Sequence, residues 1–176
     1  MNPRRLGGLT AAALLSAGLS VGAGLAAAAP DDYTVLLIDP NVVTDSQAYT
    51  AGVPTLNPGG QPGAMTVYTH RDGRTITDTV WVLPDPGAAS GAINQAKGVT
   101  PVGNQKVVSV PVGSGGQLVT GTSPDGTRSL SVLYFTEGNA ASSIEFTGPI
   151  GDPVPSDLVI DMGKQQDALI KSQLGT

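Results

Sequence analysis

Cysteine is absent from the 176 residues of this sequence. Its absence excludes disulfide bonds, metal sites built on thiolate ligands, and a lipid anchor attached through an amino-terminal cysteine. A chain without disulfides must take its stability from a hydrophobic core. About 148 residues follow the leader described below, which is enough for one domain with such a core.

Histidine occurs once, at position 70, and the only glutamates are Glu137 and Glu145. His70 lies beside Arg71 at the end of a predicted hairpin, and no G-x-S-x-G elbow supplies a serine nucleophile. The aspartates do not follow the spacing of a calcium loop. Two glycine tracts, 57–63 and 113–116, lack the Lys-Ser/Thr ending of a phosphate loop. The sequence therefore predicts no catalytic residue, no metal site and no cofactor, and we expect a protein that is not an enzyme.

Basic residues are also few, with 9 Lys and Arg against 14 Asp and Glu and a net charge of −5. Without Arg4 and Arg5, which a removed leader would carry away, the net charge falls to −7. This balance argues against nucleic acid and anionic lipid as partners. Charged residues are sparse, whereas 24 Gly and 14 Pro are typical of a loop-rich extracellular β protein.

The first 28 residues have the three parts of a secretory signal peptide. Arg4 and Arg5 are positive, residues 6–27 carry no charge, and Ala26-Ala27-Ala28 forms an A-x-A cleavage site. A transmembrane anchor is the alternative, but Gly, Ala and Ser make this run only weakly hydrophobic. We predict a signal peptide over 1–28 and a single secreted domain over 29–176. The mature protein is expected outside the cell or loosely associated with its wall, as a monomer without a stable membrane anchor.

Four β-rich runs between residues 105 and 148 predict an antiparallel meander around which the fold is organised. The runs cover 106–110, 117–120, 129–136 and 142–147. Turn-forming residues separate them, at 113–116, 123–126 and 137–139.

The amino-terminal part is less regular. Tyr33 to Ile38 is a short apolar run for which we predict a first strand. The stretch from Pro40 to Gly63 shows no period and is rich in proline and glycine. Connections of this length are usually functional or mobile. Two interpretations stay open: a binding loop with Tyr49 at its tip, or a solvated excursion.

A hairpin and two helices complete the prediction. Arg71-Asp72-Gly73 lies between two β-rich runs, where Asp-Gly favours the positive φ of a hairpin turn. Asp85-Pro86 predicts the start of a helix that Gly98 ends. The last helix begins at Ser156 or Asp157 and runs to about Leu174.

The element order is strand, long loop, hairpin, helix, meander, helix. It predicts an α+β fold, with an antiparallel β-sheet of about six to seven strands and two helices packed on it. We expect both helices on one face of the sheet.

Asp78 stands among apolar neighbours on the second hairpin strand. This position is typical of an exposed edge and, less often, of a buried partner for Arg71 or Arg128. Glu145 points away from its apolar neighbours on a strand, and we interpret it as a solvated cross-strand charge. Two converging carboxylates such as Asp78 and Glu145 would instead favour a hydrolase.

Aromatic side chains are few, and four of them are candidate ligand-binding residues: Tyr49, Tyr68, Trp81 and Tyr134. Tyr134 and Phe135 point to opposite faces of one strand, so both faces of the sheet need cover. Two interpretations follow. Either a loop covers the second face and the aromatic residues are core, or Tyr68, Trp81 and Tyr134 line a groove there.

Several segments carry a resemblance to small exported proteins of actinobacteria. These are Ala28 to Asp32 at the end of the Ala-rich signal, Ser123 to Thr127, Leu133 to Gly138 and Val159 to Gln166. The element order is also similar to that of the LpqN-type envelope lipoproteins, which have a PsbP-like α/β/α sandwich. The resemblance implies a non-catalytic accessory protein of the cell envelope. The chain departs from the family in lacking the cysteine for lipid attachment, so a lipid anchor does not carry over.

We therefore expect a secreted, non-enzymatic binding or accessory protein that recognises an envelope protein or a small apolar ligand. The alternative is a carboxylate-dependent hydrolase acting on an envelope substrate. A third interpretation is a purely structural surface protein, which predicts no concave apolar site.

Overall fold

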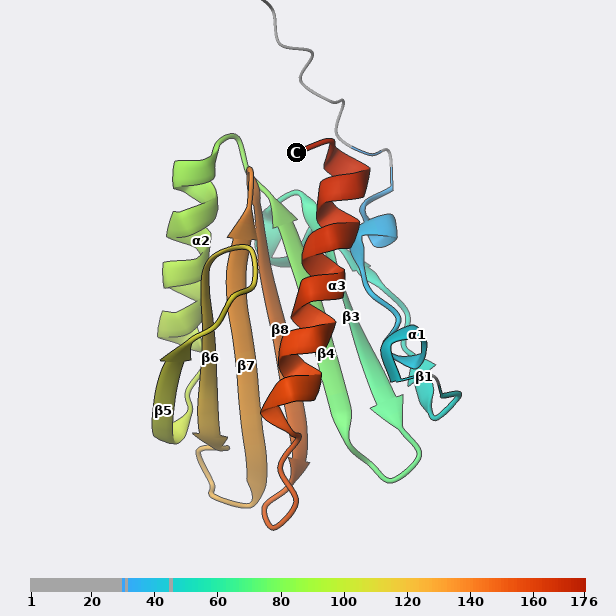
Figure 1. The fold of residues 1–176 in the computed structure, drawn as a ribbon, viewed down its shortest axis with the longest axis vertical. Coiled ribbons are helices and arrows are strands. Elements are labelled where there is room, and N and C mark those ends of the chain that lie inside the picture. Colours follow the sequence, from blue (N-terminus) through green and yellow to red (C-terminus); the bar gives the residue numbers. More distant parts are fainter. Residues whose placement is uncertain (1–29, 31, 45) are drawn as a thin grey trace, which may run out of the picture.

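The computed structural model describes residues 30, 32–44 and 46–176. The predicted signal peptide over 1–28 lies outside this part of the chain. Figure 1 shows a twisted sheet with one long helix, α3 (Ser156–Leu174), crossing it, and a second helix, α2 (Pro86–Val99), along its side. The predicted α+β fold built on an antiparallel sheet is confirmed.

The sheet is eight-stranded and antiparallel. Its strands are β1 (Tyr49–Ala51), β2 (Thr55–Leu56), β3 (Gly63–His70), β4 (Thr75–Val82), β5 (Gly103–Ser109), β6 (Ser114–Thr122), β7 (Arg128–Glu137) and β8 (Ala140–Pro149). Their order is β1-β3-β4-β8-β7-β6-β5, and β2 also pairs with β3. The hairpin β3–β4 and the meander β5–β8 therefore join through the pairing of β4 with β8.

The two long helices cover opposite faces, which corrects the expectation that both lie on one face. Leu133 of β7 packs in the core that α3 covers, whereas its neighbour Val132 packs in the core under α2. The reason lies in β7, where nearly every residue on both faces of the strand is buried. A strand that is apolar on both sides needs a helix on each.

The hairpin turn and the starts of both helices form where the sequence predicts them, whereas α2 continues through Gly98, its predicted end, to Val99. Gly73 in the β3–β4 turn has φ +85°. Asp85 caps α2 by accepting a hydrogen bond from the backbone N–H of Ala88 at 2.8 Å, and Pro86 is the first helical residue. Gly175 ends α3 with φ +68°, a left-handed conformation that glycine adopts without strain.

The predicted strand at 33–38 is wrong: Tyr33–Leu36 is the 3-10 helix η1. Asp32 caps it by accepting from the Thr34 backbone N–H at 2.9 Å. The apolar character of the run reflects burial against α3 and the sheet, since Leu36 and Ile38 belong to that core. The backbone N–H of Ile38 finds side-chain acceptors, described below, in place of a neighbouring strand.

The stretch from Pro40 to Gly63 is a chain of short elements. It forms α1 (Pro40–Thr44), then β1 and β2, which both pair with β3, and then the 3-10 turn η2 (Pro58–Gly60). Because two of these elements join the sheet, the segment lies along one sheet edge and its end turns over the face that α2 covers.

Candidate functional site: a cavity beneath helix α2

A cavity of about 380 Å³ lies on the α2 side of the sheet. We call it the α2-side cavity. Its lining consists of Pro58, Gly59, Gln61, Met65, Thr77, Thr79, Trp81, Ala92, Gln95, Ala96, Val99, Thr100, Ser143 and Glu145. Three elements that are distant in the sequence therefore enclose it: the η2 turn, α2, and the sheet. Its volume is in the range of small-molecule sites.

The floor of the cavity is built by alternation along two paired strands. Thr77, Thr79 and Trp81 of β4 share one face because side chains alternate along a strand. Thr77 is paired with Glu145, and Thr79 with Ser143, so these β8 residues project from the same face. The intervening residues point into the other core. The floor is thus more polar than the core around it.

The η2 turn forms one wall and is held against the sheet by Trp81. The indole Nε1–H donates a hydrogen bond to the carbonyl oxygen of Pro58 at 3.2 Å. Asn57 precedes the turn with φ +52°, and its backbone N–H donates to Gly63 at 2.9 Å. The indole N–H is therefore occupied by the protein, which leaves the aromatic ring as the part of Trp81 that contributes to the lining.

Helix α2 forms the opposite wall with small side chains. Ala92 and Ala96 are half-buried, line the cavity and pack against the core below the helix. Val99 extends this wall at the end of the helix. A larger residue at 92 or 96 would fill space that the alanines leave open.

Glu145 is the only ionisable residue in the lining. Burial raises the pKa of this carboxyl above its usual range, and a hydrogen bond from Thr147 opposes the effect. Among the described residues no Lys, Arg or His forms an ion pair with it. The expected solvated cross-strand charge is therefore half-buried, and it faces a cavity.

The four aromatic residues predicted to bind a ligand do not lie together. Trp81 lines the cavity, and Tyr134 is buried in the core beneath α2 on the same side of the sheet. Tyr68 is buried in the opposite core, which α3 covers, and Tyr49 packs against that core. The predicted groove containing Tyr68, Trp81 and Tyr134 is thus not formed, because Tyr68 points to the other face.

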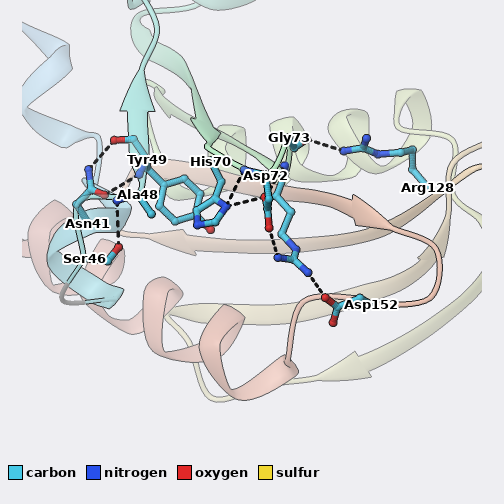
Figure 2. A network of polar contacts seen from close by, with 10 residues as sticks. Asn41, Ser46, Ala48, Tyr49, His70, Asp72, Gly73, Arg128 and Asp152 are labelled. Carbon is cyan, nitrogen blue, oxygen red and sulfur yellow. Dashed lines mark hydrogen bonds and ion pairs between the residues drawn. The ribbon is translucent and has the colours of Figure 1, made fainter.

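Tyr49 is held in place by its neighbours. Its backbone N–H donates to Asn41 and its carbonyl accepts from the same amide, both at 2.9 Å. Figure 2 shows the Tyr49 ring beside that of His70, with ring centroids 4.9 Å apart. The residue therefore starts strand β1, and the binding loop with Tyr49 at its tip is not what this segment forms.

The β3–β4 turn carries a cluster of exposed charges. Arg74 pairs with Asp72 and with Asp152, and Arg128 donates to the carbonyl of Gly73 at 2.9 Å (Figure 2). The backbone N–H of Arg74 lowers the pKa of Asp72, and His70 adds to this. The contacts with Asp152 and Arg128 link the turn to neighbouring loops, and those with Asp72 lie within the turn, which gives the cluster a structural role.

Asp78 lies in the core between the sheet and α3, with no exposed surface. This corrects the expectation of an exposed edge, because β4 pairs with strands on both sides. No arginine contacts it among the described residues. Its Oδ2 accepts from the Ile38 backbone N–H at 3.0 Å, while Oδ1 has no partner. Burial raises the pKa of Asp78 to about 7.

Asp78 and Glu145 therefore point to opposite faces of the sheet. Asp78 is paired with Ile144, whose side chain lies in the α3-side core, while Glu145 is paired with Thr77 above the cavity. Two carboxylates that act together on one substrate must face the same space. This pair cannot do so.

Gln166 is a structural residue that the sequence alone did not indicate. It is fully buried in α3 and contacts the backbone of Leu36 and Ile38. Its helical spacing is the pattern that would have found it: Met162, Gln166 and Ile170 lie four residues apart on one face.

The described part of the chain offers no group of three or more His, Cys, Asp or Glu side chains placed to hold a metal ion. Among the same residues, no helix combines the length and apolar character needed to span a bilayer.

The sequence matches no protein-family model and no curated protein. Its fold is similar to that of the extracellular domain of PknH from Mycobacterium tuberculosis, with a TM-score of 0.56. The two are 12% identical, and the match covers 79% of this chain and 95% of that domain. The chain therefore shares its fold with an extracellular domain of a mycobacterial protein.

Proposed function

We propose that this protein is an extracellular binding domain that holds a small, largely apolar molecule in the α2-side cavity. The observation that carries the proposal is the cavity itself, enclosed by η2, α2 and the floor of β4 and β8. Ligand sites are typically concave and mostly apolar with a few polar groups that orient the ligand. Trp81, Met65 and the alanines of α2 supply the apolar surface, and the threonines, Ser143 and Glu145 supply the polar groups.

Two further observations support an extracellular setting. The amino-terminal 28 residues have the pattern of a secretory signal peptide. The fold is similar to that of an extracellular domain. We propose that the domain binds without catalysing a reaction, acts as a monomer, and belongs with the LpqN-type envelope proteins that its sequence resembles.

Native mass spectrometry of the protein purified gently from its own host tests the proposal. We expect an added mass that is lost on denaturation. The variant Ala96→Phe fills the cavity from the α2 wall and should lose that mass. Ala168→Phe makes the same change at an exposed position of α3 and should keep it. A bare mass for the wild type under conditions that preserve complexes would contradict the proposal.

A protein partner is the second candidate function, and strand β5 favours it. Every residue from Asn104 to Ser109 is exposed, and β5 is the last strand of the described sheet. An unpaired edge strand offers its backbone groups to a strand of another protein. Cross-linking on intact cells distinguishes the two functions, because a partner at β5 would be captured equally by wild type and Ala96→Phe.

A further inference from the structure

Glu145 lies in the cavity without a counterion. It is half-buried on the floor of the α2-side cavity, and no basic side chain of the described residues pairs with it. A carboxylate that has lost part of its hydration and has no partner gains more from a cation than a fully solvated carboxylate does. In its ionised form Glu145 therefore has no counterion within the part of the chain that the structure describes.

The basic side chain of α2, Lys97, is directed elsewhere. The amine of Lys97 donates to Gln117 Oε1 at 2.7 Å and lies 5.7 Å from the centre of the Tyr134 ring. It lines a second, smaller cavity on the other side of that helix, together with Ser114. Lys97 thus does not line the α2-side cavity, and the Glu145 carboxylate stays available to pair with a ligand.

The rest of the lining suits a cation that carries an apolar body. Trp81 lines the cavity, and its indole N–H is already bonded to the Pro58 carbonyl. Aromatic rings attract cations through the negative charge on their faces. Met65 adds a polarisable apolar surface, and the hydroxyls of Thr77 and Ser143 flank the carboxylate on the floor.

We infer that the α2-side cavity selects a ligand with one positive charge on an apolar body, a protonated aliphatic amine, whose ammonium group pairs with Glu145. This inference rests on the proposed function, since it names the class of ligand for the same cavity. The cavity volume of about 380 Å³ lies in the range of small-molecule sites and suits a short alkyl or single-ring amine. An anion of the same shape is disfavoured by the like charge of Glu145.

Trp81 makes the test direct, because it is the only tryptophan in the sequence and it lines the cavity. Tryptophan fluorescence is titrated at neutral pH with octylamine, octanol and octanoate, which share one chain and differ in the charge of the head group. We expect octylamine to bind about 10- to 100-fold more tightly than octanol, the range expected for a hydrogen bond to a charged group. Octanoate should bind most weakly.

Glu145→Gln keeps the shape of the side chain and should bring octylamine to the affinity of octanol. Circular dichroism checks that the variant is folded. The dependence of binding on salt concentration is a separate test that uses the wild-type protein alone. Salt should weaken the binding of octylamine and leave octanol unchanged.

The outcomes separate the inference from the proposed function. Equal binding of octylamine and octanol to the wild type, lost in Ala96→Phe, would overturn the amine inference and leave the cavity as a binding site. An amine preference that survives in folded Glu145→Gln would also overturn it. Failure of all three probes to bind would count against the proposed function itself, and the inference would fall with it.

Discussion

The backbone N–H of Ile38 donates to Asp78 Oδ2 and to Gln166 Oε1 at the same time, at 3.0 Å in each case. The Gln166 amide in turn donates to the carbonyl of Leu36. These contacts join the segment after η1, the central strand β4 and the helix α3. They supply polar partners to a backbone that enters the core outside any regular element, where unpaired groups would be costly.

The first prediction concerns pH. The pKa of Asp78 is about 7 in the folded protein and 3.8 in the reference state. Between these values the folded state holds a proton that the unfolded state has released, so raising the pH favours unfolding. The contribution of Asp78 is complete below about pH 4 and disappears as the pH rises through 7. From pH 5 to pH 8 we expect the free energy of unfolding to fall by roughly 2–3 kcal/mol from this group.

Asp78→Asn isolates the effect, because the amide does not titrate. Its difference in unfolding free energy from the wild type, measured by urea denaturation at several pH values, should move in favour of the variant between pH 5 and 8. Contributions from Glu145 and the exposed carboxylates are common to both proteins and cancel. A pH-independent difference would show that Asp78 stays ionised in the fold.

The second prediction concerns Gln166. Gln166→Met preserves the length of the side chain and removes both of its polar groups. The Leu36 carbonyl then loses a buried donor, and Asp78 becomes the sole acceptor for Ile38. We expect a loss of about 1–3 kcal/mol in the free energy of unfolding.

The neighbouring Gln165 is exposed and provides a matched control. Gln165→Met should change stability by no more than about 0.5 kcal/mol. Hydrogen exchange at the Ile38 amide should accelerate in Gln166→Met alone. Equal effects of the two substitutions would mean that the buried contacts contribute nothing specific.

The third prediction compares two helical glycines. A Cβ at Gly163 of α3 would lie 2.1 Å from Leu133 Cδ2 and 3.1 Å from Val112 Cγ1, whereas one at Gly91 of α2 meets nothing within 4 Å. Gly163→Ala should therefore destabilise by about 1–3 kcal/mol through overpacking. Gly91→Ala should stabilise by about 0.5–1 kcal/mol through helix propensity. Thermal unfolding of the two variants should give shifts of opposite sign, and shifts of the same sign would contradict the close packing of Gly163 against Leu133.

The fourth prediction concerns the cap of α2. Asp85→Ala removes the acceptor for the Ala88 backbone N–H and should cost about 0.5–2 kcal/mol. Asp161→Ala removes only an exposed 3.8 Å contact with Lys164 and is the control. Because α2 forms a wall of the cavity, Asp85→Ala should also weaken probe binding. A cap variant with wild-type stability and affinity would show that packing alone holds the helix.

Local patterns in the sequence predicted much of the fold. The Asp-Gly turn at 72–73, the cap at Asp85 and the glycine that ends α3 depend on interactions within a few residues, and all are confirmed. The placement of α2 and α3 on opposite faces depends on packing between elements that are distant in the sequence, which local patterns do not describe. The burial of both faces of β7 was the available indication, since Tyr134 and Phe135 already required cover on both sides.

The site was less accessible to prediction. Alternation placed Trp81 and Glu145 on known faces of their strands, but the register between β4 and β8 decides that these faces coincide. Asp78 and Tyr68 were misplaced because their environment is made by α3 and η1, which lie far from them in the sequence. Alanines 92 and 96 carry no chemical pattern, and their importance comes only from the space they leave.

The sheet that divides the two cores also separates the residues that hold the amino-terminal segment from the residues that line the cavity. The residues that secure the amino-terminal segment, Asp78 and Gln166, lie on one side, and the residues that line the cavity lie on the other. Substitutions at Thr77, Ala96 or Glu145 would therefore change the lining of the cavity and leave the contacts of Asp78 and Gln166 in place.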